Sequence, residues 1–308
     1  MGAGWVAGVT RARSMAVGRL GPDRARELAD AATLSDALHT LAGTSYRRAL
    51  ETEAESAEAG RAVLGALLWQ LRVLAGWQPR LGVAAVRQLA AGFEIANTCD
   101  HLASLSGEPR PAPYRLGALS TAWPRLARTV SPGEVRAVLT ASPWGDPGGE
   151  SAAVVATGMR LSADARLVAD LPPAARWAAG DAALLVARET FLRGRGPTGR
   201  ATAYAERILG RSAVRASSYD DFRVRLPSAA RWALEGTERP ADLWRAEARW
   251  WSEVERDGLR MLHRARFDVS PVVGATAVLS VDAWRVRAAL VAAAYEGRAQ
   301  EDFDDLLE

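Results

Sequence analysis

The chain has 308 residues, of which 49% are hydrophobic and 24% are charged, as in a globular protein with a sizeable core. Its net charge of +3 is small, and acids alternate with arginines along most of its length, so the charge does not call for nucleic acid as a partner. The single cysteine, Cys99, excludes an intrachain disulfide. No apolar window reaches the roughly 20 residues that a membrane-spanning helix needs, and no signal peptide is evident; we therefore expect a cytoplasmic protein.

The composition predicts the fold class. Alanine, leucine and arginine dominate, and all three favour helix. Runs of valine, isoleucine and threonine with a period of two residues, which would indicate strands, are nearly absent. We predict an all-α fold, and the length predicts two or three domains of roughly 100–150 residues each.

Apolar residues at helical spacing, interrupted by glycine and proline, predict helices along the whole chain. The predicted helices are 5–17, 23–31, 34–41, 62–74, 83–105 (with a break at Gly92 as the alternative), 116–126, 134–139, 161–171, 176–192, 204–209, one that begins near 218, 243–262, 281–295 and 299–307.

Two stretches rich in proline and glycine divide this series of helices. Residues 108–113 (EPRPAP) contain three prolines, which indicates an extended connector. Residues 194–199 (GRGPTG) match the dinucleotide fingerprint G-x-G-x-x-G, but they follow a predicted helix rather than a strand, and Pro197 lacks the amide that a phosphate would use. We interpret this stretch as a second linker. The predicted units are therefore 1–108, 114–194 and 200–308.

One polar pair stands out in the helix that ends the first unit. Glu94 and Asn97 lie one turn apart, so both side chains project from the same face. Asn97 is the only asparagine of a chain that contains no lysine. Its retention suggests that the position needs an amide, and we interpret the pair as structural, joining polar groups within or between helices.

Two weaker copies of this stretch follow, at Asp181 and at Asp282. The three acids are 87 and then 101 residues apart, and each precedes a glycine by 13 to 15 residues. This spacing suggests three similar units; chance recurrence in a chain rich in alanine and glycine is the alternative.

The residues that most often carry chemistry are scattered. His39, His101 and His263 are far apart in sequence, and Cys99 and His101 diverge by roughly 200° on a helix, so they cannot share an ion. We interpret Cys99 as buried and His101 as lying on a polar face. No nucleotide, serine-hydrolase or zinc-protease motif occurs. We expect no catalytic residue, cofactor or metal, and a binding or structural protein is favoured over an enzyme.

The tryptophans separate into two groups. Five fall on apolar helical faces and are expected in the core: Trp5, Trp69, Trp177, Trp232 and Trp284. Trp250 and Trp251 are adjacent and must point to different faces, so we expect one to be exposed as an anchor for a partner.

Short motifs recur in a fixed order. They are TRAR at 10–13, LSDALHTL at 34–41 with Tyr46 after it, and EIAN at 94–97. Near the C-terminus, Asp282 and Arg287 occupy the acidic and basic positions of another copy, with Arg285 where asparagine is usual, and the middle copy keeps only Asp181. In order and spacing these features resemble the C/d family of central-stalk subunits in V/A-type (vacuolar/archaeal-type) rotary ATPases. The recurrent motif of that family is D/E-x-x-N-L-K/R, and we interpret the chain as a divergent bacterial member.

The resemblance implies three similar helical bundles arranged as a funnel. Such a protein is peripheral, on the cytoplasmic face of the membrane. It links the central stalk to the membrane proteolipid ring, and so couples ATP hydrolysis or synthesis to transport of protons or sodium. Its implied partners are stalk subunits and the ring, with membrane contact only through the ring and no nucleic acid or small-molecule substrate.

Two other interpretations remain open. The first is a free-standing helical adaptor or regulator that docks through Trp250 and Trp251. The second is a helical enzyme, which would need a polar pocket that the sequence does not indicate.

Overall fold

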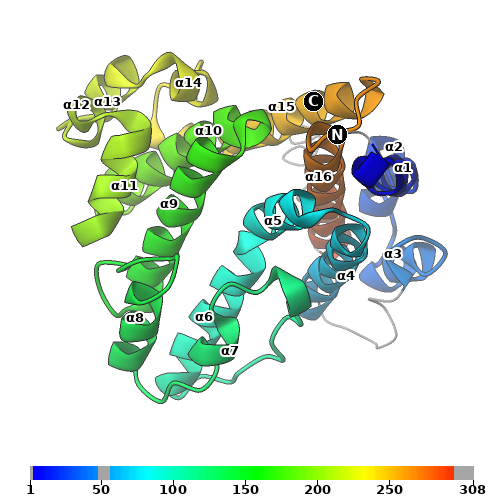
Figure 1. Ribbon diagram of the computed structural model, residues 1–308, viewed down its shortest axis with the longest axis horizontal. Helices are drawn as coiled ribbons and strands as arrows, with labels where there is room; N and C mark the ends of the chain where they lie inside the picture. The colour runs from blue at the N-terminus through cyan, green and yellow to red at the C-terminus, as the bar shows by residue number, and fades with distance from the viewer. Residues whose placement is uncertain (1–2, 48–55, 295–308) are drawn as a thin grey trace. The chain divides into compact units, whose positions relative to one another are not determined.

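The computed structural model describes residues 3–47 and 56–294, and within them every regular element is helical, as the composition predicts (Figure 1). The predicted helix 299–307 lies outside the described residues. The α-helices are α1 (Ala3–Val17), α2 (Pro22–Ala29), α3 (Leu34–Leu41), α4 (Ser56–Gly76), α5 (Arg80–Leu89), α6 (Ala91–Leu105), α7 (Trp123–Leu126), α8 (Pro132–Thr140), α9 (Ala152–Asp170), α10 (Ala175–Ala187), α11 (Gly199–Leu209), α12 (Arg211–Val214), α13 (Tyr219–Arg225), α14 (Ser228–Arg231), α15 (Leu243–His263) and α16 (Ser270–Ala294). Short 3₁₀ segments are η2 (Gly117–Leu119), η3 (Pro172–Ala174), η5 (Trp232–Leu234) and η6 (Pro240–Asp242), and η4 (Arg188–Leu192) is a π-helical turn.

The chain divides into two compact units. One consists of Met1–Val86 together with Trp251–Glu308, and the other of Arg87–Trp250. The first unit is therefore assembled from both ends of the chain, and the second is inserted between them. The three-unit division stays a prediction.

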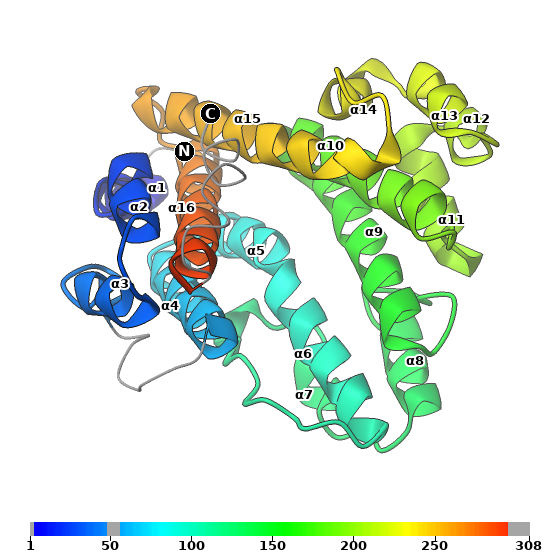
Figure 2. The ribbon, with the colours of Figure 1, turned by 180° about the vertical axis from the view of Figure 1, so that it is seen from behind.

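The first unit is built around α16. This helix is mostly apolar with no single polar face, a pattern typical of a helix that neighbours surround, and it packs against α1, α2, α3 and α4 (Figure 2). Pro271 stands in its first turn, where a missing N–H costs no hydrogen bond. The sequence predicted this helix only from residue 281, because the apolar stretch before it has no polar stripe to mark a helical period.

The second unit has two hydrophobic cores. The first core joins α6 to α7, α8 and α9 through residues such as Ile95, Leu102 and Leu139. The second core surrounds α10 and includes α11, α13 and the start of α15. The predicted connector at 108–113 is non-helical, as expected, but Ile95 and Leu102 lie before it and pack against residues after it.

Helix boundaries follow local chemistry where a capping side chain is present. Thr33, Ser131, Ser151 and Ser218 each accept a hydrogen bond from the backbone N–H three residues later, which satisfies one orphan donor of the helix that follows. The helix predicted at 83–105 is instead two helices, α5 and α6, which meet at Ala90.

Candidate functional site

The carboxylate of Glu94 is buried on α6 and accepts three hydrogen bonds. The backbone N–H groups of Thr121 and Ala122 donate to its two oxygens at 2.6 Å each, and Nε1 of Trp144 donates at 2.9 Å. Thr121 and Ala122 directly precede α7, whose first N–H groups have no acceptor within the helix. Glu94 therefore fixes the turn that starts α7, with charge-assisted hydrogen bonds in place of solvation.

Asn97 lies one turn beyond Glu94 and contacts a different loop. Its Nδ2 donates to the carbonyl oxygen of Tyr114 at 2.9 Å, and its Oδ1 accepts from the N–H of Tyr114 at 2.7 Å. Only an amide both donates and accepts in this way, which explains why neither arginine, serine nor aspartate serves here. The pair thus binds the segments that follow α6: Asn97 binds the backbone of Tyr114, and Glu94 binds two backbone N–H groups and the indole of Trp144.

Asp282 on α16 repeats the arrangement of Glu94. The N–H groups of Leu20 and Gly21 donate to its two oxygens at 2.9 and 2.7 Å, and the hydroxyl of Tyr46 donates at 2.8 Å. Leu20 and Gly21 directly precede α2, which begins at Pro22. Burial raises the pKa of Tyr46 well above its usual range, and the carboxylate of Asp282 raises that pKa further.

The two sites share a construction that is visible only in three dimensions. In each, a long helix supplies an acid, two successive backbone N–H groups before a short helix donate to it, and an aromatic residue after the next helix supplies a third donor. Sequence reasoning found both acids and named Tyr46 only as part of a motif; it missed Trp144 and gave neither aromatic residue the role of a hydrogen-bond donor. Their signal was their place a few residues beyond the paired short helices α2–α3 and α7–α8.

Asp181 on α10 has different surroundings. It is half-buried and lies near Asp164 of α9, which is buried with no hydrogen-bond partner for its Oδ2 among the described residues. Burial raises the pKa of Asp164 well above its usual range, and the charge of Asp181 adds to this effect. Burial also raises the pKa of Asp181.

The two arginines of the C-terminal motif have different positions on α16. Arg285 is buried and forms a two-pronged ion pair with Glu255 of α15 at 2.7 and 2.5 Å. Such planar pairing suits a guanidinium, which accounts for arginine where the resemblance led us to expect asparagine. Arg287 is exposed and lies beside α4, where a Cβ added to Gly60 would be 3.5 Å from its Nε.

Trp250 and Trp251 point to different neighbours, and each ring is half-buried. Nε1 of Trp250 donates to the carbonyl of Trp177 at 2.9 Å, and its ring packs on the core around α10. Trp251 stacks on Trp284 of α16, with the ring centroids 5.7 Å apart. A partner would therefore reach only part of either ring, and the partner-contact role stays a prediction.

The other tryptophans are less buried than their sequence pattern predicts. Trp177 is in the core, whereas Trp69 on α4 is 39% exposed, so the core prediction for Trp69 is wrong. Trp5, Trp232 and Trp284 are half-buried. A wide indole ring covers the edge of a helix interface even where its tip reaches solvent.

His101 and Cys99 occupy positions opposite to those expected. His101 is buried, and its Nε2 lies 2.9 Å from Oγ1 of Thr129, whereas Cys99 is only half-buried. Burial lowers the pKa of His101, as does the charge of Arg110. The structure places Cys99 and His101 in separate contacts, since the Cys99 sulfur lies 3.8 Å from the carbonyl oxygen of Ala152.

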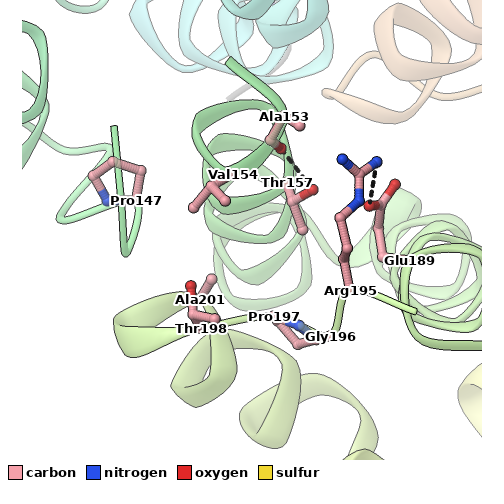
Figure 3. Close-up of a pocket in the computed structure, with 10 residues that line it drawn as sticks. All are labelled: Pro147, Ala153, Val154, Thr157, Glu189, Arg195, Gly196, Pro197, Thr198 and Ala201. Atoms are coloured by element: carbon pink, nitrogen blue, oxygen red, sulfur yellow. Dashed lines mark hydrogen bonds and ion pairs between the residues drawn. The ribbon is translucent and has the colours of Figure 1, made fainter. Parts of the chain in front are cut away.

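The G-x-G-x-x-G stretch borders a small cavity in the second unit (Figure 3). The cavity volume is ≈ 30 Å³, room for about two water molecules. Glu189 and Arg195 face each other at its edge and form an ion pair at 3.6 Å. Gly199 has a positive φ of 55°, and a Cβ there would lie 3.1 Å from the Cα of Gly148, so the glycine serves close packing of two loops.

Comparison with protein-family models found no match, and a search of curated proteins found no significant match. In the part of the chain that the structure describes, no group of histidine, cysteine and acidic residues could hold a metal ion. Among the same residues, no helix is long and apolar enough to span a membrane.

Proposed function

We propose that the chain is a non-catalytic central-stalk component of a V/A-type rotary ATPase, a divergent relative of the C/d family of stalk subunits. In this role it would connect the rotor stalk to the proteolipid ring at the cytoplasmic face of the membrane. It would couple ATP hydrolysis or synthesis to ion transport mechanically, as three similar helical units arranged as a funnel.

The observation that carries the proposal is the shared construction around Glu94 and Asp282. The sequence motif that resembles the family marks both acids, and each accepts two successive N–H groups that precede a short helix. The two acids occupy the same position of the motif and make the same kind of contacts. This agreement favours an internally repeated helical unit over chance recurrence, and the resemblance implies such a repeated unit.

The contacts of these residues also suit a mechanical role. Glu94, Asn97 and Asp282 use their polar atoms to bind the chain's own backbone, which stabilises the turns between helices. A rotor component that transmits torque needs such rigid turns, because a loose turn would absorb the rotation.

Affinity capture of the tagged chain from detergent-solubilised membranes of its own cells tests the proposal. We expect the proteolipid ring and other stalk subunits to be recovered with it and to be identified by mass spectrometry. Recovery of the chain alone from the soluble fraction would overturn the rotary function and favour the adaptor.

The variant Trp251→Ala distinguishes an adaptor from a rotary stalk component, because the two functions predict different results for it. An adaptor that docks through Trp250 and Trp251 should lose its partner when Trp251 is replaced by alanine. A rotary stalk component should keep the ring in that variant, provided that circular dichroism shows the variant to be folded.

A further inference from the structure

An apolar surface is exposed where α1 meets the turn between α4 and α5. Val6 on α1 is 45% exposed, Trp77 on the turn is 54% exposed, and Leu81 at the start of α5 is 75% exposed. Single exposed apolar residues are ordinary, but a group that includes a tryptophan and a leucine indicates an interaction surface. We call Val6, Trp77 and Leu81, with the neighbouring Arg80, the α1/α4–α5 patch.

The contacts beneath the patch hold its two parts together. Nε2 of Gln78, in the turn, donates to the carbonyl of Gly8 on α1 at 3.1 Å. A Cβ added to Gly82 on α5 would lie 3.0 Å from the ring of Trp5 on α1. The turn is therefore fixed on α1, and Trp77 and Leu81 stay exposed on a firm base, all within the first compact unit.

The sequence around the patch residues carries only positive charge, and the one acid of α4 is Glu58, in the first turn of that helix. Residues 3–22 and 59–86 contain no aspartate or glutamate, and their arginines are Arg11, Arg13, Arg19, Arg61, Arg72 and Arg80. Arg72 lies one turn from the exposed Trp69 on α4, and Arg80 lies between Trp77 and Leu81. Both Arg72 and Arg80 are exposed, and neither has an ion pair in the described part of the chain.

We propose that the α1/α4–α5 patch binds the surface of an anionic lipid bilayer. Tryptophan prefers the headgroup level, where its ring is buried and its N–H stays wet, and leucine gains from insertion just below that level. Arginine pairs with phosphate through a fork of donors, and residues 3–22 and 59–86 contain no acid that would repel anionic headgroups. The positive charge of the arginines therefore favours a membrane with negatively charged lipids over a neutral one.

This inference goes beyond the proposed function, which implies membrane contact only through the proteolipid ring. The patch would add direct contact with lipid, and pure lipid vesicles contain no ring. A failure of lipid binding and a failure of ring capture are therefore separate results.

Flotation of the full-length chain with lipid vesicles tests the proposal. One set of vesicles contains phosphatidylcholine alone, and the other contains equal parts of phosphatidylcholine and phosphatidylglycerol. We expect the chain to float with the anionic vesicles only, and its binding to weaken as salt is raised, because salt screens the arginines.

Two double variants locate the contact. Replacing Arg72 and Arg80 by glutamine should weaken binding about tenfold or more, since each arginine near an anionic surface adds to affinity. Trp77→Ser with Leu81→Ser should weaken binding comparably through lost insertion. The matched controls lie in the second unit: Arg115→Gln with Arg128→Gln changes the net charge equally, and Val130→Ser with Leu192→Ser removes equally exposed apolar side chains.

The same measurements can refute the proposal. If the folded chain does not float with anionic vesicles, or floats equally with both sets, the patch does not select anionic lipid and an acidic protein becomes the better partner. If the control variants lose as much binding as the patch variants, the contact is elsewhere.

Discussion

At the scale of single residues, buried polar side chains of this chain stabilise backbone that lies far away in sequence. Asp282 is 261 and 262 residues from the two N–H groups that donate to it, and Glu94 is 27 and 28 residues from its own. A buried carboxylate is costly unless donors replace its water, so each acid depends on the full set of donors around it.

The third donor to Asp282 can be removed without changing the fold around it. Tyr46→Phe deletes the hydroxyl that donates to Oδ2 of Asp282 at 2.8 Å and leaves the two backbone donors in place. We expect the free energy of unfolding to fall by about 1.5–3 kcal/mol, the usual range for a hydrogen bond to a charged group, as measured by urea denaturation.

Tyr219 supplies the matched control for this substitution. Its ring is buried in the second unit, and its hydroxyl has no hydrogen-bond partner among the described residues. Burial raises the pKa of Tyr219 to about 12. Tyr219→Phe should leave stability unchanged or raise it slightly, because it removes a buried polar group that no acceptor compensates. Equal losses in the two variants would show that the Asp282 contact adds nothing specific.

The sequence could identify Glu94, Asn97 and Asp282, but not what they bind. Their spacing and the uniqueness of Asn97 were visible in the chain itself. Their partners are mostly backbone groups, which carry no sequence signature, and the distance along the chain to those partners is not encoded by any local pattern. The donor roles of Tyr46, which the sequence marked only as part of a motif, and of Trp144 were missed for the same reason.

At the scale of elements, helical periodicity predicted most of the helices, but it did not predict how closely neighbouring helices approach each other. α15 and α16 cross where Gly258 faces Gly274, and a Cβ added to Gly274 would lie 2.6 Å from the carbonyl oxygen of Gly258. Both positions are glycine because only glycine lets two helix backbones come so near. In sequence, Gly258 looked like an ordinary helical glycine, and Gly274 lay before the predicted start of its helix.

We expect opposite effects for two glycine-to-alanine substitutions in the first unit, one at this crossing and one away from it. Gly274→Ala should lower the free energy of unfolding by about 1–3 kcal/mol, because the added methyl group forces the helices apart. Gly65→Ala on α4 meets no atom within 4 Å and should raise it by about 0.5–1 kcal/mol through helix propensity alone. Urea denaturation measures both. A neutral result for Gly274→Ala would mean that α15 and α16 can separate at little cost.

At the scale of the whole molecule, the sequence placed boundaries by composition, whereas the cores follow contacts. The proline-rich stretch at 108–113 is non-helical, as predicted, yet Ile95 and Leu102 before it pack with Leu126 and Leu139 after it. A connector rich in proline marks where helices end. It does not mark where a core ends, because a short connector can bring its two flanking helices together as easily as it can separate them. The division into two compact units, with the first built from both ends of the chain, could not be anticipated from local composition.

The two divisions predict different behaviour for fragments of the chain. Residues 87–250 contain both cores of the second unit, so we expect this fragment to unfold cooperatively in urea, with the near-ultraviolet circular dichroism of packed tryptophans. Residues 114–194, one of the units predicted from sequence, lack α6, which carries Glu94 and the core residues Ile95 and Leu102, and lack α11, which packs on α9. That fragment should show a shallow, non-cooperative transition, because its exposed apolar faces have lost their partners. Cooperative unfolding of 114–194 by itself would instead favour the boundaries drawn from composition and an independently folding middle unit.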